Sequence, residues 1–134
     1  MDAKRSEEPL VLFADDDVDL HELMRAALRR LDWDLDCVTN GLDALAAFRK
    51  RRHDAIILDL MMPKLNGYEF LMDVKMIDPE APERTVVLTG TGEDTWGLFD
   101  RSSVCAFLTK PIDLDELIPE VEECLRRSEA KTTA

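Results

Sequence analysis

The chain has 134 residues, 46% of them hydrophobic and 34% charged, which suits one globular domain with a sizeable core. Its net charge of −12 argues against nonspecific binding to nucleic acid, because the phosphates would repel it. No stretch reaches the roughly 20 apolar residues of a membrane span, so we expect no membrane partner.

Five apolar runs are typical of β-strands. In chain order they are residues 10–14, 33–38, 55–59, 85–89 and 104–109. The second run alternates apolar and acidic side chains, as an edge strand does. The others are nearly continuous, which is typical of strands in a parallel sheet with both faces buried.

Segments with apolar residues at helical spacing follow these runs. They are residues 20–31, 42–51, 70–77, about 93–100 and 113–127. The fourth has only a weak apolar pattern. Asn40-Gly41 and Asn66-Gly67 are predicted turns before the second and third helices. Pro119 is expected to kink the last helix or to delay its start.

Residues 1–8 are expected to be a disordered lead, 9–127 a single domain and 128–134 a tail. The lead lacks the apolar core of a secretory signal, which favours a cytoplasmic protein. Three cysteines without metal-type spacing, an odd number, suggest reduced thiols. We expect the cysteines to fill the core and the histidines to lie at the surface: Cys37, Cys105, Cys124, His21 and His53.

Strand and helix alternate five times, which predicts a parallel sheet with helices on both faces. The expected fold is a three-layer, doubly wound, flavodoxin-like (βα)5 domain with strand order 2-1-3-4-5. In that order the first and third strands are neighbours, and all strands end at the same edge. Five polar side chains should therefore converge there: Asp15, Asp16, Asp59, Thr89 and Lys110.

These side chains have a common chemical use. Clustered carboxylates repel one another unless a cation lies among them, and all-oxygen ligands suit Mg²⁺. Asp59 can then attack phosphorus and form an acyl phosphate, while Lys110 and Thr89 stabilise the transferring oxygens. Taken singly, each has a simpler interpretation: a helix cap for residues 15–17, a cap or loop acid for Asp59, and a strand-end or surface group for the other two.

Four motifs occur in order along the chain. They are Asp15-Asp16 after the first strand, Asp59-Leu-Met-Met-Pro-Lys-Leu-Asn-Gly after the third, Thr89 after the fourth and Lys110-Pro111 after the fifth. Together they resemble the receiver domain of bacterial two-component response regulators, from about Pro9 to Arg127.

The resemblance implies that Asp59 accepts a phosphoryl group from a histidine kinase or a histidine phosphotransfer protein. It further implies that Asp16 and Asp59 bind Mg²⁺ directly, with the Met61 backbone carbonyl as a third ligand. Asp15 would act on the metal mainly through water, and Lys110 would hold the phosphoryl group.

In this family phosphorylation biases a two-state switch. The resemblance implies that Thr89 moves toward the phosphoryl group and that Phe107, where a tyrosine is frequent, turns inward. The change would alter the face formed by the fourth helix, the fifth strand and the last helix, where a downstream protein or a second receiver binds. With no effector domain after the last helix, output is expected through such contacts, unless the chain is an excised receiver.

Two other functions fit part of the pattern. A haloacid-dehalogenase-type phosphatase also uses an acid after its first strand, a hydroxyl and a lysine, but its Asp-x-Asp-x-Thr/Val motif is not completed at Asp19. Turnover of an aryl phosphate would favour it. A scaffold with the receiver fold and an inactive site is the other alternative, although the presence of all five key side chains counts against it.

Overall fold

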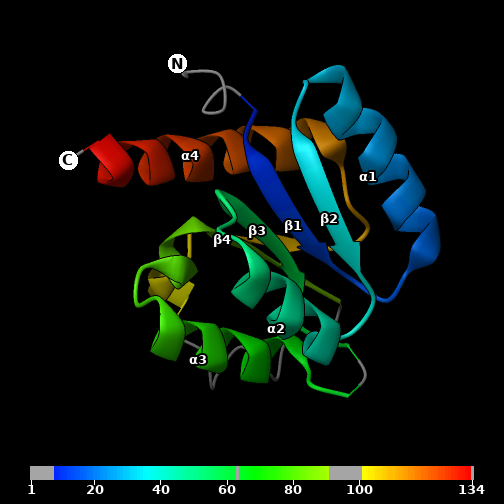
Figure 1. Ribbon diagram of the computed structural model, residues 1–134. Helices are drawn as coiled ribbons and strands as arrows, with labels where there is room; N and C mark the ends of the chain where they lie inside the picture. Colours follow the sequence, from blue (N-terminus) through cyan, green and yellow to red (C-terminus); the bar gives the residue numbers. More distant parts are fainter. Residues whose placement is uncertain (1–7, 63, 91–100, 134) are drawn as a thin grey trace.

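The computed structural model describes residues 8–62, 64–90 and 101–133 (Figure 1). The fourth predicted helix, about 93–100, and nearly all of the predicted disordered lead lie outside these residues. Among the described residues, no helix is both long and apolar enough to cross a membrane.

Five parallel strands form one sheet in the order β2-β1-β3-β4-β5, which confirms the predicted order. The strands are β1 (Leu10–Ala14), β2 (Asp34–Val38), β3 (Ala55–Asp59), β4 (Thr85–Thr89) and β5 (Ala106–Thr109). Every residue of β1, β3 and β4 is buried, whereas the edge strand β2 is only partly buried. The nearly continuous apolar runs are therefore the central strands.

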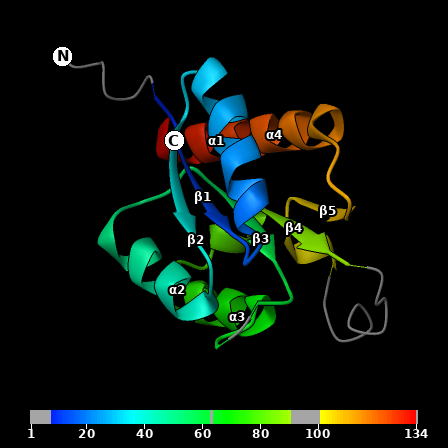
Figure 2. The same cartoon turned by 90° about the vertical axis from the view of Figure 1, so that its right-hand side faces the viewer.

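Helices cover both faces of the sheet. In the described part of the chain they are α1 (Val18–Arg30), α2 (Gly41–Lys50), α3 (Gly67–Ile77) and α4 (Leu114–Thr133), with 3-10 turns η2 (Ala81–Arg84) and η4 (Arg101–Ser103). Figures 1 and 2 show α2 and α3 on one face and α1 and α4 on the other. One apolar cluster lies on each face, the first containing Phe48 and Phe70 and the second Met24 and Leu117. These three layers confirm the predicted fold class.

The two Asn-Gly pairs begin helices rather than form separate turns. The side chain of Asn66 accepts a hydrogen bond from the Glu69 backbone N–H, and the Glu69 carboxylate accepts one from the Asn66 backbone N–H, which is a capping box. Gly67 then lies directly against the end of β3, where an added Cβ would meet the Asp59 carbonyl oxygen and lie 2.6 Å from Leu60 Cα. Glycine is thus required because the backbones approach closely.

The last helix is longer than predicted. It begins at Leu114, so Pro119 does not delay its start, and it continues to Thr133, so residues 128–133 are helical rather than a tail. Tertiary contacts hold this extension. Ser128 is buried, and its hydroxyl accepts a hydrogen bond from Arg52 Nη1 at 2.9 Å. Local sequence pattern alone cannot show a contact across so many residues.

Several apolar residues in the segments with helical spacing are exposed. They are Leu23, Leu31, Leu42 and Ile77. The buried apolar faces of α1, α2 and α3 are therefore narrower than the sequence pattern suggests. The cysteines also differ from the prediction, because Cys124 is buried but Cys37 and Cys105 are only half-buried.

His53 is fully buried, so the prediction of a surface residue is wrong. Its Nε2 lies 2.8 Å from Asp36 Oδ2 on β2, and its carbonyl accepts a hydrogen bond from Arg84 Nε at 2.8 Å. Its ring also stacks on Phe48. Burial lowers the pKa of His53 below its ordinary value, although the Asp36 carboxylate opposes this shift. Asp36, from another element, pairs with one ring nitrogen, whereas Nδ1 is buried without a hydrogen bond to the described residues.

Candidate functional site

The polar residues at the strand ends converge at one edge of the sheet, as predicted. Asp15 follows β1 and Asp59 ends the neighbouring strand β3. Thr89 ends β4 and pairs in register with Thr109 of β5, which places Lys110 directly beyond the same edge. The parallel topology thus brings four separate strand ends to one place.

Three carboxylates form a compact cluster there. One oxygen from each of Asp15, Asp16 and Asp59 lies within 4.8 Å of the other two. Asp15 and Asp59 are buried, whereas Asp16 is exposed. Burial and the nearby charge of Asp15 raise the pKa of Asp59, although the Met61 N–H and Lys110 oppose this shift. Burial and repulsion from Asp15 therefore disfavour the charged form of Asp59.

Lys110 provides the positive charge at the cluster. Its Nζ lies 2.9 Å from Asp15 Oδ2 and 3.2 Å from Asp59 Oδ2. Burial opposes the charge on this ammonium, but the two carboxylates raise the pKa of Lys110 above its ordinary value. One ammonium among three carboxylates leaves an excess of negative charge, which a divalent cation would neutralise.

The residues at this cluster fit Mg²⁺. All of the donors are carboxylate oxygens, and Mg²⁺ typically binds through one or two carboxylates and retains several waters. Asp15 Oδ2 is buried and receives no hydrogen bond of good geometry from the described residues, so the ion pair with Lys110 is its compensation. Asp16 lies on the exposed side, where waters can complete the coordination.

Met61 lies beside the cluster through its backbone. Its N–H donates a hydrogen bond to Asp59 Oδ1 at 3.0 Å, while its side chain is exposed. This bond fixes the rotamer of Asp59 and leaves Oδ2 facing Lys110. The role of the Met61 carbonyl as a metal ligand stays a prediction.

The three consecutive acids after β1, residues 15–17, have different roles. Asp17 is the N-cap of α1, because its side chain accepts hydrogen bonds from the backbone N–H groups of Asp19 and Leu20. Asp15 instead points into the cluster, and its Oδ1 accepts the Asp17 N–H at 2.9 Å. A helix cap therefore explains one of the three acids only.

His21 is a site neighbour that the sequence analysis placed wrongly at the surface. It is buried, its Nε2 lies 2.6 Å from the Asp15 carbonyl oxygen, and its ring packs against Phe13. The contact holds the backbone that carries the cluster's first carboxylate. The signal was present in the sequence, since His21, Met24 and Leu28 have the helical spacing of one buried face.

Thr89 and Phe107 are the two residues of the predicted switch. Thr89 is almost fully buried, and its carbonyl accepts the Lys110 backbone N–H at 2.8 Å. Its hydroxyl donates to the Gly90 carbonyl at 3.4 Å, a long and weak bond. Phe107 is half-buried and packs against the apolar cluster beneath α2 and α3. Movement of either residue stays a prediction.

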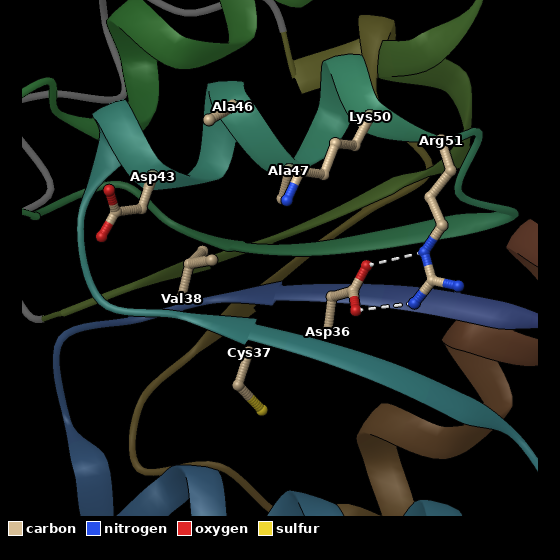
Figure 3. Close-up of a pocket in the computed structure, with 8 residues that line it drawn as sticks. All are labelled: Asp36, Cys37, Val38, Asp43, Ala46, Ala47, Lys50 and Arg51. Carbon is tan, nitrogen blue, oxygen red and sulfur yellow. Dashed lines mark hydrogen bonds and ion pairs between the residues drawn. The ribbon is translucent and has the colours of Figure 1, made fainter.

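A hollow of about 510 Å³ lies elsewhere, between β2 and α2 (Figure 3). Asp43 stands at one end of it and Lys50 and Arg51 at the other, while Arg51 forms an ion pair with Asp36 at 2.9 Å. None of the clustered acids lines this hollow. The chemistry of the strand ends therefore lies outside it.

Comparisons with known proteins agree with this geometry. The response regulator receiver domain family matches residues 11–122. Similar curated proteins include the transcriptional regulatory protein TrcR of Mycobacterium tuberculosis, 34% identical over 123 residues, and a CpxR homolog of Haemophilus influenzae, 36% identical over 121 residues. Each match covers 88% of this chain but only 46% and 51% of the relative. The chain thus spans about half the length of these relatives.

Solved structures share the fold over nearly the whole chain. The signal receiver domain of a putative Luxo repressor protein from Vibrio parahaemolyticus has a TM-score of 0.83 at 25% identity, covering 94% of this chain and 96% of that one. A CheY-like receiver domain protein from Methanospirillum hungatei also has a TM-score of 0.83, at 18% identity, covering 93% and 99%. At that identity the second similarity concerns the fold alone.

Proposed function

The chain belongs to the response regulator receiver domain family of two-component systems, and we propose that Asp59 is its phosphoryl acceptor. The observation that carries the proposal is the placement of Lys110, whose ammonium contacts both Asp59 and Asp15 at the end of the central strands. A buried nucleophile beside a fixed cation suits transfer of an anionic group.

Asp59 acts as the nucleophile. Its Oδ1 is occupied by the Met61 N–H, so Oδ2 is the oxygen that bonds to phosphorus. As this bond forms, the bond from phosphorus to the imidazole nitrogen of a phosphohistidine donor breaks. Lys110 moves from a carboxylate pair to an oxygen of the transferred group, and its ammonium limits charge build-up there. Thr89 supplies a hydroxyl donor to another of these oxygens.

Asp15, Asp16 and Asp59 are the residues that would hold Mg²⁺, with the Met61 carbonyl as a further ligand. The bound ion supplies charge neutralisation on the phosphoryl oxygens. The excess negative charge of the cluster supports this assignment, as does Asp15 Oδ2, which receives no hydrogen bond of good geometry from the described residues. Asp16, which is exposed, would be the ligand nearest to solvent.

The partners of this receiver are proposed from its family. A histidine kinase or histidine phosphotransfer protein donates the phosphoryl group. Output uses the face that includes β5 and α4, and its partner is a downstream protein or a second copy of the receiver. The fourth predicted helix, about 93–100, which the family places on this face, lies outside the described residues. Phe107 on β5 links this face to the site, because Lys110 follows the same strand.

The test is the intact mass of the protein after incubation with acetyl phosphate and Mg²⁺. One added phosphoryl group is expected on the wild type, and none on Asp59→Asn or after metal chelation. Asp73→Asn, which removes an exposed carboxylate of α3, is the matched control and should still carry the group. An adduct on Asp59→Asn would contradict the proposal.

The same experiment separates the alternatives. If no adduct forms on the folded wild type with saturating Mg²⁺, beryllofluoride, which mimics an aspartyl phosphate, distinguishes rapid hydrolysis from an inactive scaffold. Binding of beryllofluoride would support rapid hydrolysis, and absence of binding would support the scaffold. Sustained turnover of an aryl phosphate would instead indicate a phosphatase.

A further inference from the structure

Two thiols meet on the side of the domain covered by α4. Cys105 directly precedes β5, and Cys124 lies in the middle of α4. The side chain of Cys105 reaches the helix, because its Sγ lies 3.8 Å from the Glu120 carbonyl oxygen. In an α-helix that carbonyl bonds to the N–H four residues later, which belongs to Cys124. The Cys105 sulfur therefore lies over the helical turn that Cys124 closes.

The two side chains are neighbours in the fold. Cys124 belongs to the apolar cluster between the sheet and α4, and Cys105 packs against the same cluster. Each thiol is the main influence on the pKa of the other. Both thiols are free in this structure. A disulfide between them would bring the two sulfurs to about 2.05 Å.

The two thiols differ in accessibility and acidity. Cys105 is half-buried and Cys124 is fully buried, so solvent reagents reach Cys105 first. The hydrogen bond to Cys124 and the charge of Arg127 lower the pKa of Cys105, although burial opposes them. The same hydrogen bond, with burial, raises the pKa of Cys124. Cys105 is thus suited to be the attacking thiol and Cys124 the resolving one.

We propose that Cys105 and Cys124 are a redox-sensitive pair that forms a disulfide when the protein meets a hydroperoxide. The Cys105 thiolate attacks one peroxide oxygen, the O–O bond breaks and hydroxide leaves, which gives a sulfenic acid. The Cys124 sulfur then attacks the Cys105 sulfur, and the departing hydroxyl takes the Cys124 proton and leaves as water. With hydrogen peroxide, two thiols give one disulfide and two waters, so the sulfurs are oxidised and the peroxide is reduced.

The third cysteine provides an internal control. Cys37 lies on the edge strand β2 and is half-buried like Cys105, but burial raises the pKa of its thiol. Exposure alone would therefore make Cys37 and Cys105 react alike. Contact with a second thiol predicts that the disulfide joins Cys105 to Cys124 and leaves Cys37 reduced.

The disulfide would tie the start of β5 to α4 and enclose the segment that contains Phe107 and Lys110. It therefore links two elements of the proposed output face by a covalent bond. The disulfide itself does not depend on phosphorylation of Asp59, and its test needs no phosphoryl donor. Failure of either proposal leaves the other intact.

The test is exposure of the reduced full chain to hydrogen peroxide, followed by intact mass and peptide mapping without reductant. The wild type and Cys37→Ser should each lose about 2 Da, the mass of two thiol hydrogens, with the link mapped to residues 105 and 124. Cys105→Ser should show no loss. Cys124→Ala should retain a sulfenic acid at Cys105, detected by a dimedone adduct.

Three outcomes would overturn the proposal. The first is oxidation of Cys105 beyond sulfenic acid in the wild type without any 2-Da loss. The second is a link that maps to Cys37. The third is a 2-Da loss that persists in Cys105→Ser. Because the first two are measured on the wild type, the proposal stays testable even if a variant does not fold.

Discussion

Lys110 Nζ lies 3.2 Å from Asp59 Oδ2, although the two residues are separated by 51 positions in the chain. Lys110→Ala removes the cation that faces the transferred group, so phosphorylation by acetyl phosphate should slow on the order of 100-fold. Lys75→Ala, on the exposed side of α3, is the matched control and should leave the rate unchanged. An unchanged rate in Lys110→Ala, measured by intact mass over time, would show that the ammonium has no catalytic part.

Gly67 permits the close approach of α3 to the end of β3. Gly67→Ala places a Cβ against the Asp59 carbonyl, so the free energy of unfolding should fall by about 1–3 kcal/mol. Gly90→Ala is the control, because no atom of the described residues lies within 4 Å of its added Cβ. Urea denaturation of both variants measures the difference. Equal free energies of unfolding for the two variants would mean that α3 can shift away from the end of β3 without destabilising the fold.

Mg²⁺ should stabilise the fold through the acidic cluster. At 100 times its dissociation constant, a ligand that binds only the folded state adds about 2.7 kcal/mol to the free energy of unfolding. Asp16→Asn should reduce this gain by about 1.4 kcal/mol for each tenfold loss of affinity, and Asp73→Asn should leave it intact. Thermal unfolding of each variant with Mg²⁺ and with a chelator measures how much Mg²⁺ adds to its free energy of unfolding. A full gain in Asp16→Asn would exclude that carboxylate as a ligand.

Much of this site could be predicted from the sequence, because its residues follow directly from strand ends. Each acid, hydroxyl or ammonium ends an apolar run or follows it within two residues, and parallel topology brings such positions together. Asp15 and Lys110 are separated by 95 positions in the chain, yet the strand order alone places them at one edge. The residues of the site that could be predicted are those whose positions depend on the strand order alone.

The misplaced residues depend instead on partners in other elements. Burial of His53 depends on Asp36 on β2, which pairs with its Nε2, and burial of His21 depends on the Asp15 carbonyl, which pairs with its Nε2. The end of α4 likewise depends on the contact between Arg52 and Ser128. The periodicity of apolar residues identifies the buried face of a helix, but it does not show which polar group of another element contacts that face.

The buried His53 predicts a pH dependence of stability. Its pKa is lowered by burial from the ordinary value of 6.5, so the unfolded chain takes up the proton first. Its contribution to stability is therefore complete above about pH 6.5 and is lost as the pH falls through the lower folded-state pKa. His53→Gln should unfold with a weaker pH dependence than the wild type in urea melts from about pH 8 to about pH 5. Parallel curves for the two proteins would contradict the assignment.

The identity of the acceptor carboxylate is the central claim, and chemical trapping tests it most directly. Protein phosphorylated with acetyl phosphate and Mg²⁺ is reduced with borohydride, which converts an aspartyl phosphate to homoserine, and the peptides are sequenced by mass spectrometry. Homoserine at position 59 alone is the predicted result. Homoserine at position 15 or 16, with Asp59 unchanged, would contradict the account.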